Sequence, residues 1–168
     1  VPAESISLKR PKNQWHPVWD VVAGVAPPIY MAPYLGLAQA AAEQALAHAT
    51  KKGGSIPAVI AVGQMENALT TAELAWRDMV QLAGNCDFSP SIENTNAQLV
   101  RKTILANAVK ETVAHAVELV GGPAFYSQLP FERMWRDVQA AHYHPLPEKK
   151  QHVFTGRHRL GIEAPWDA

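Results

Sequence analysis

The sequence predicts an all-α protein, an antiparallel four-helix bundle with an additional short C-terminal helix. Three observations support this fold class. Apolar residues recur at spacings of three and four over long stretches, glycines and prolines mark the ends of these stretches, and no alternating run of strand length appears. The chain has 168 residues, of which 48% are hydrophobic and 18% charged, and this suits one globular core.

We assign residues 25–168 to the helical bundle. Residues 1–24 contain three prolines and show no sustained period, so we interpret them as an extended lead-in from a missing upstream domain. The chain begins Val1-Pro2, without a methionine or a charged leader segment, and we therefore expect it to be a piece of a longer protein.

Two long helices are expected first. An alanine-rich stretch follows Pro27-Pro28 and runs to about Lys52, with small side chains that would let a neighbouring helix approach closely. The second helix, from Pro57 to about Asn85, shows the clearest helical period of the chain. Its predicted inward positions are Val62, Met65, Leu69, Ala72, Trp76, Met79 and Ala83. At the usual rise per residue this helix would be roughly 40 Å long, which suits a bundle.

Three more helices are predicted towards the C-terminus. Ser89-Pro90 is typical of an N-cap and first turn, and the third helix would run from there to Gly121. A fourth helix is expected from Pro130 to about Tyr143, and a short fifth helix over about residues 148–161. Prolines between the fourth and fifth helices interrupt the helical pattern.

Composition excludes several classes of function. Lys+Arg and Asp+Glu both number 15, so there is no basic field for a nucleic acid partner. No stretch looks apolar for long enough to span a bilayer, so no membrane partner is expected. The single cysteine, Cys86, excludes an internal disulfide. Four histidines lie close in sequence without a Cys, Asp or Glu at ligand spacing, so no metal site is expected: His142, His144, His152 and His158.

The most informative segment is 121–137, GGPAFYSQLPFERMWRD. Gly121 and Gly122 end an apolar, helix-periodic run, and glycine takes the left-handed conformation that a helix C-terminus commonly needs. Pro130 suits the first turn of a new helix, and Glu132 places a carboxylate where the helix dipole favours one. The segment therefore predicts a corner between two helices.

This corner resembles the C-terminal helical domain of the acyl-CoA dehydrogenase superfamily of flavoenzymes, and the resemblance covers nearly the whole chain. In that family a helix ending in Gln-x-x-Gly-Gly is followed by an aromatic residue, a proline, Glu-Arg and then Arg-Asp. The order of these elements is more specific than a lone Gly-Gly pair. The corresponding residues here are Glu118, Gly121, Gly122, Phe125, Pro130, Glu132, Arg133, Arg136 and Asp137.

The resemblance implies the C-terminal domain of an FAD-dependent oxidoreductase that catalyses α,β-dehydrogenation of acyl-CoA thioesters. The domain would contribute to flavin binding and to the assembly of a cytoplasmic homotetramer. Electrons would pass to an electron-transfer flavoprotein, or arrive from a flavin reductase. Alone, the chain would be inactive, because the flavin and substrate pockets need the upstream domains.

Four residues match family positions near the flavin. In the family the Gln-x-x-Gly-Gly segment grips the dinucleotide end of a neighbouring subunit's cofactor, which assigns cofactor-binding roles to Glu118, Gly121 and Gly122. Phe125 occupies the aromatic position near the acyl or cofactor side. Glu118 replaces the glutamine, so it can accept hydrogen bonds from ribose hydroxyls but cannot donate while ionised. Simple helix termination is the alternative interpretation of the two glycines.

The catalytic glutamate of the family has no counterpart in this sequence. Where many members hold Glu-Gly-Thr the chain reads Pro145-Leu146-Pro147, and Ala26 stands at the position that other branches use. The preceding His144 therefore becomes the candidate catalytic residue. An imidazole titrates near neutral pH and can serve as a base or hydrogen-bond to an attacking phenolate. A satisfied structural histidine is the alternative.

Two further functions remain open. Members of the superfamily that oxygenate substrates with reduced flavin and oxygen often have a histidine in this loop and tend to lack the family's Arg-x-x-Phe-Gly segment. This chain has Lys51-Lys52-Gly53-Gly54 there instead. The first alternative is thus a flavin-dependent monooxygenase, using reduced FMN or FAD supplied by a reductase on an aromatic or heterocyclic substrate. The second is a non-catalytic oligomerisation bundle.

Overall fold

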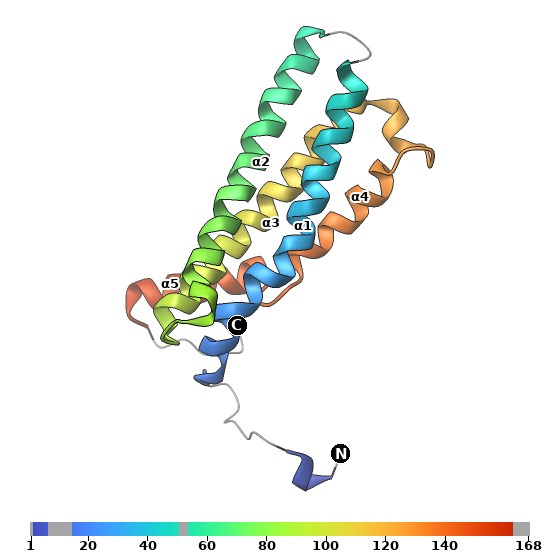
Figure 1. Ribbon diagram of the computed structural model, residues 1–168. Coiled ribbons are helices and arrows are strands. Elements are labelled where there is room, and N and C mark those ends of the chain that lie inside the picture. Colours follow the sequence, from blue (N-terminus) through green and yellow to red (C-terminus); the bar gives the residue numbers. More distant parts are fainter. Residues whose placement is uncertain (1, 7–14, 51–53, 163–168) are drawn as a thin grey trace.

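The computed structural model describes residues 2–6, 15–50 and 54–162, and within these ranges every regular element is a helix (Figure 1). The α-helices are α1 (Val18–Thr50), α2 (Ile56–Ala83), α3 (Ile92–Val120), α4 (Phe131–Val138) and α5 (Glu148–Leu160). The short 3-10 helices are η1 (Ala3–Ser5), η2 (Gly84–Cys86), η3 (Gly122–Phe125) and η4 (Gln139–His142). The predicted all-α bundle with a short C-terminal helix is confirmed.

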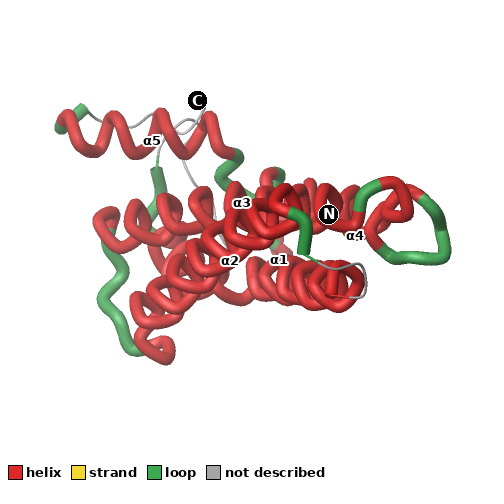
Figure 2. Tube along the Cα trace, turned by 90° about the horizontal axis from the view of Figure 1, so that it is seen from above, coloured by secondary structure: helices red, strands yellow, loops and turns green. Residues whose placement is uncertain are grey.

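The central element of the fold is α3. It packs against α1, α2, α4 and α5, and α1 and α2 also pack against each other. Figure 1 shows the three long helices running side by side, with α4 along the side that α1 and α3 share. Figure 2 shows α5 lying outside the group of long helices. The connections that matter for the site are the corner after α3 and the loop between η4 and α5.

The core combines alanines with larger apolar side chains on all three long helices. Alanines and methionines fill the buried positions of α1 and α2, and the distance between helix axes depends on the size of such contact residues. Met65, Ala72 and Met79, which the period of the second helix placed inward, are completely buried. The larger core residues of α3 are Leu105, Val109, Val113 and Val120.

α1 begins earlier than predicted. The extended lead-in expected over residues 1–24 is wrong from Val18 onward, where the chain is helical. The backbone N–H of Val18 donates to Nδ1 of His16 at 3.2 Å, which satisfies one of the free donors of the first turn. Pro27 and Pro28, interpreted above as the point before the helix starts, lie inside it.

A side chain of α3 replaces a donor that proline removes from α1, and a side chain of α2 adds a further hydrogen bond to α1. Pro28 has no N–H, so the carbonyl of Gly24 lacks its helical donor. Gln98 of α3 supplies one, because its Nε2 donates to Gly24 O at 3.2 Å and to Met79 O at 3.0 Å. Trp76 of α2 donates through Nε1 to the carbonyl of Pro28 at 2.9 Å. These contacts from neighbouring helices let α1 continue where local sequence rules favour a boundary.

The remaining helices follow the predicted ranges closely, with differences at their ends. Ser91, not Ser89, caps α3, and its Oγ accepts a hydrogen bond from the N–H of Asn94 at 3.1 Å. The predicted fourth helix ends as an α-helix at Val138 and continues to His142 as a 3-10 helix. Such a tightened last turn is common at helix C-termini.

By length and composition, α1 meets the criteria for a membrane-spanning helix, with a mean hydropathy of 1.4 over its most apolar window. The expectation that no stretch is apolar for long enough is therefore wrong for this helix. In the fold, α1 packs against α2 and α3, and the core helix of a bundle meets the same criteria.

We predict that Gln98→Met destabilises the bundle by about 1–3 kcal/mol, because it leaves the buried carbonyl of Gly24 without a donor. Urea unfolding followed by circular dichroism measures the change. The matched control is Gln139→Met, since Gln139 donates to the carbonyl of Trp135 on the exposed side of its helix. There the change should stay within about 0.5 kcal/mol. Equal effects of the two substitutions would contradict the bridging role of Gln98.

Candidate functional site

The candidate catalytic residue His144 lies in the loop between η4 and α5, and side chains of the bundle hold the backbone of this loop. Lys102 of α3 donates through Nζ to the carbonyl of His144 at 2.9 Å and to that of Leu146 at 3.0 Å. The hydroxyl of Tyr30, from α1, donates to the carbonyl of Pro145 at 3.0 Å. Consecutive carbonyls of one loop are therefore held by two different helices.

The imidazole of His144 contacts two tyrosines of α1. The hydroxyl of Tyr34 lies 2.8 Å from Nε2, and the ring of Tyr30 stacks on the imidazole with 4.7 Å between ring centroids and 18° between planes. The two tyrosines are about one helical turn apart, so they project from the same face of α1. Among the residues that the structure describes, none hydrogen-bonds to Nδ1 of His144.

Burial and charge set the protonation states of this site. Burial lowers the pKa of His144, and the positive charge of Lys102 lowers it further. Burial also lowers the pKa of Lys102 to about 8, against the opposing charge of Glu148. Burial raises the pKa of Tyr30, which keeps the phenol protonated and able to donate. At neutral pH the site therefore favours an uncharged imidazole beside a charged ammonium group.

An apolar cavity of about 370 Å³ lies next to His144. Tyr30 and Pro145 line this cavity and also belong to the surroundings of the imidazole. Ala26 and Pro145, which stand at the two positions that the resemblance assigns to a catalytic carboxylate, both face the cavity. Trp15 and Trp19 supply flat aromatic surface. None of the described residues lining it is charged, so the cavity suits an apolar, planar ligand.

The predicted cofactor-binding residues gather at the opposite end of α3. Glu118, Gly121, Gly122 and Phe125 all line an open pocket of about 500 Å³ at the corner between α3 and α4, together with Trp135. Gly121 ends α3 with a φ of 72°, a conformation that glycine adopts without strain. A Cβ built on Gly121 or Gly122 would meet no other atom within 4 Å, so the backbone is open to a ligand.

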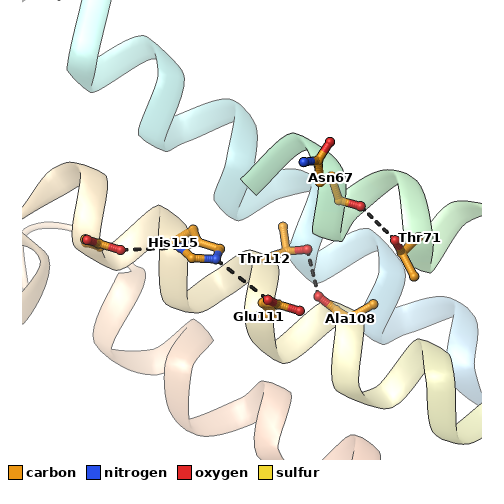
Figure 3. A network of polar contacts seen from close by, with 7 residues as sticks. Asn67, Thr71, Ala108, Glu111, Thr112 and His115 are labelled. Atoms are coloured by element: carbon orange, nitrogen blue, oxygen red, sulfur yellow. Dashed lines mark hydrogen bonds and ion pairs between the residues drawn. The ribbon is translucent and has the colours of Figure 1, made fainter. Parts of the chain in front are cut away.

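Glu118 already has a partner on its own helix. Nδ1 of His115 lies 3.3 Å from Oε2 of Glu118, and Nε2 of the same ring lies 3.9 Å from Oε1 of Glu111. Figure 3 shows His115 turned toward Glu111 along α3. The segment Lys51–Gly53, which replaces the family's arginine segment, lies outside the described residues.

This corner fits the flat and hydroxyl-bearing parts of a flavin nucleotide better than its phosphates. The exposed rings of Phe125 and Trp135 offer stacking surfaces, and the carboxylate of Glu118 can accept from ribose hydroxyls. The described lining includes two carboxylates, those of Glu118 and Glu132, and no Lys or Arg. Cations for a pyrophosphate would have to come from another part of the protein or another subunit. The cofactor roles of the four residues stay predictions.

The two candidate regions are far apart on one chain. Lys102, which contacts the His144 loop, and Glu118, at the corner, are separated by about 24 Å along α3 at 1.5 Å per residue. The Arg136-Asp137 pair of the corner motif is a contact of adjacent residues, 3.0 Å between Nη2 and Oδ1, and both side chains are exposed. It therefore does not tie α4 to another helix.

Sequence reasoning missed three residues of the His144 site: Tyr30, Tyr34 and Lys102. Tyr34 and His144 are 110 positions apart, and no local spacing connects residues so distant. The only local signals were a pair of tyrosines at helical spacing and a lysine within an apolar stretch of the third helix.

Two histidines of the C-terminal region, His142 and His152, approach one carboxylate. Glu148 approaches Nδ1 of His142 at 3.6 Å and Nε2 of His152 at 3.8 Å. Across the described ranges, no group of three or more His, Cys, Asp or Glu side chains has the geometry to hold a metal ion.

Comparison with solved structures finds the same fold in larger proteins, one of which was solved with bound FMN. KijD3 in complex with FMN and a dTDP-linked amino-keto sugar superposes with a TM-score of 0.87 at 20% identity, over 99% of this chain and 43% of that protein. The nitrososynthase from Micromonospora carbonacea var. africana gives 0.75 at 22% identity, over 85% of this chain and 40% of that protein. The 3-HSA hydroxylase from Rhodococcus sp. RHA1 superposes with a TM-score of 0.71 at 18% identity, over 88% of this chain and 40% of that protein.

The chain thus spans less than half the length of these proteins, and the likeness concerns the fold. No curated protein matches it in sequence. The family profile described as acyl-CoA dehydrogenase, C-terminal domain, matches residues 29–148, which include the tyrosines of α1, the corner and His144. The chain belongs to this family of acyl-CoA dehydrogenase C-terminal domains.

Proposed function

We propose that this chain is the C-terminal domain of a flavin-dependent monooxygenase that uses reduced flavin and oxygen on an aromatic or heterocyclic substrate. The observation that carries the proposal is the composition of the cavity beside His144. Ala26 and Pro145 line it at the two positions where dehydrogenases of the family keep their base, and neither can remove a proton. His144 is the nearby group that can.

In the proposed reaction the substrate ring lies in the apolar cavity, between the tryptophans and Tyr30. Nδ1 of the neutral His144 accepts the proton of a substrate hydroxyl or ring N–H, which makes the substrate a better nucleophile. Tyr34 fixes the imidazole by its contact with Nε2, at 2.8 Å. The bound reduced flavin supplies the activation of oxygen. The apolar walls of the cavity offer no charged group that would hold water beside the substrate ring.

Several features of the whole enzyme belong to the same proposal. The flavin is FMN or FAD, reduced by a partner reductase, and the solved relatives are described with FMN or FADH2. The corner at Glu118 to Phe125 is too far from His144 to contact the same flavin ring. In this proposal it contacts the flavin of a neighbouring subunit in a homo-oligomer. The simplest such assembly is a tetramer, located in the cytoplasm. A bundle used only for oligomerisation would retain no flavin at this corner.

Acyl-CoA dehydrogenation is the competing function, and one experiment separates the two. The full-length protein is mixed anaerobically, in its oxidised flavin form, with butyryl-CoA, octanoyl-CoA and palmitoyl-CoA, and flavin absorbance is followed. The reduced form is then given oxygen with p-cresol or indole. We expect no bleaching by the thioesters and oxygen-dependent hydroxylated product. Bleaching by a thioester, without aromatic product, would establish the dehydrogenase instead.

We predict that His144→Gln in the full-length enzyme lowers product formation from p-cresol by about 10²–10⁴-fold, the range for loss of a general base. The amide can still contact Tyr34 but does not take up a proton at neutral pH. His152→Gln is the matched control, because His152 lies on α5 with a half-exposed side chain. Unchanged turnover in His144→Gln would remove the catalytic assignment.

The pH dependence of kcat/KM gives a separate prediction. A base works in its neutral form, and burial and Lys102 lower the pKa of His144 below its ordinary value. Activity should therefore fall to half only at a pH below about 6.5, the ordinary histidine value, as the pH passes through the lower pKa of the folded site. An acid limb centred above that value would contradict the neutral imidazole.

A further inference from the structure

Lys102 is a fully buried lysine without a carboxylate partner. Its residue is 1% exposed, and within the described chain it takes part in no ion pair. Both hydrogen bonds of Nζ go to backbone carbonyls, those of His144 and Leu146. Burying an ammonium group costs free energy that a neutral side chain of similar size would not require. Both hydrogen bonds that offset this cost are made to the loop that carries His144.

We propose that Lys102 is a positioning residue for His144, which holds the loop 144–146 so that the imidazole stays stacked on Tyr30 and in contact with Tyr34. The inference rests on the function proposed above for His144. Lys102 touches neither the cavity nor the imidazole, so it acts through the backbone of the loop.

The chemistry of the loop explains why one ammonium group suits this task. The loop contains Pro145 and Pro147, which have no N–H, so local backbone donors are few. An ammonium group has three donors that rotate freely, and two of them reach carbonyls on either side of Pro145. Tyr30 donates to the carbonyl between them. Without Lys102 the buried carbonyl of Leu146 and the partly buried carbonyl of His144 would lose this donor, and the loop would shift to reach water.

The charges around this corner supply a matched control. Besides burial, Lys102 is the charge that lowers the pKa of His144, and Glu148 is the charge that acts on Lys102. Lys110 lowers the pKa of His142, where Lys102 has a smaller effect in the same direction, and Lys110 does not act on His144. Lys110 lies on the same helix as Lys102. Lys110→Met therefore removes a lysine from α3 without removing a hydrogen bond to the loop.

The experiment compares Lys102→Met, Lys102→Gln and Lys110→Met in the full-length enzyme. Met and Gln both remove the charge, but only Gln keeps a hydrogen-bond donor, so their difference isolates the hydrogen bonds. The first measurement is product from p-cresol and hydrogen peroxide released, both per bound flavin. The second is the pKa of His144, from the pH dependence of deuterium exchange at its imidazole C2–H by mass spectrometry.

We expect Lys102→Met to lower product per flavin by about 10²-fold, the cost of a misplacement of roughly 1 Å, with KM for p-cresol unchanged and peroxide increased. Lys102→Gln should retain more product than Lys102→Met. The pKa of His144 should rise in both, since a positive charge is lost, and more in Lys102→Met because water enters. Lys110→Met should raise the pKa of His142 and leave His144 and product unchanged.

Equal product loss in Lys102→Met and Lys102→Gln would overturn the inference, because charge alone would then matter. A Lys102→Met enzyme that forms as much product per flavin as the wild type, with an unchanged pKa of His144, would also overturn the inference. If Lys102→Met does not fold, complete loss of product in a folded Lys102→Gln enzyme overturns it. If the wild type makes no oxygen-dependent product, the proposed function fails. The difference in the pKa of His144 between Lys102→Met and Lys102→Gln then still decides whether the hydrogen bonds of Lys102 hold the imidazole, and equal pKa values would overturn the inference.

Discussion

The fold depends on a row of buried polar side chains along α3. Thr95, Gln98 and Lys102 follow one another at spacings of three and four, so they lie on one side of the helix. Each reaches a different part of the chain: Thr95 donates to Asp20 near the start of α1 at 2.6 Å, Gln98 reaches carbonyls of α1 and α2, and Lys102 reaches the loop before α5. A buried polar group left without a partner costs about 1–3 kcal/mol, so this row specifies where three segments dock.

The row on α3 meets the places where proline has removed backbone donors. Pro28 leaves a carbonyl of α1 unsatisfied, and Gln98 donates to it. Pro145 and Pro147 deplete the loop of donors, and Lys102 donates there. Each of these hydrogen bonds contributes only about 1 kcal/mol net to stability. Without them, however, α1 near Pro28 and the loop at Pro145 would have unsatisfied carbonyls in this conformation. The apolar core brings the helices together, and the polar row determines the path of α1 and the loop that holds His144.

The same interactions explain which parts of the structure were predictable from sequence. The limits of α2, α3 and α5 follow from period, caps and glycines, which act within a few residues. The start of α1 was misplaced because Pro27-Pro28 is a local boundary signal, and the donors that override it come from other helices. Likewise, the corner motif placed four residues on one surface because they are close in sequence. The partners of His144 are distant in sequence, and only the packing of α1 and α3 brings them together.

α3 also explains how one short domain presents two separate candidate regions. Its N-terminal half holds the His144 loop and the apolar cavity, and its C-terminal end forms the glycine corner with Phe125. About 24 Å of rigid helix lies between them, and a straight helix cannot bring its two ends to one flavin ring. The two regions also differ in chemistry: the described lining of the corner carries two carboxylates and no cation, and that of the cavity is uncharged. α3 therefore fixes the distance between the two candidate regions.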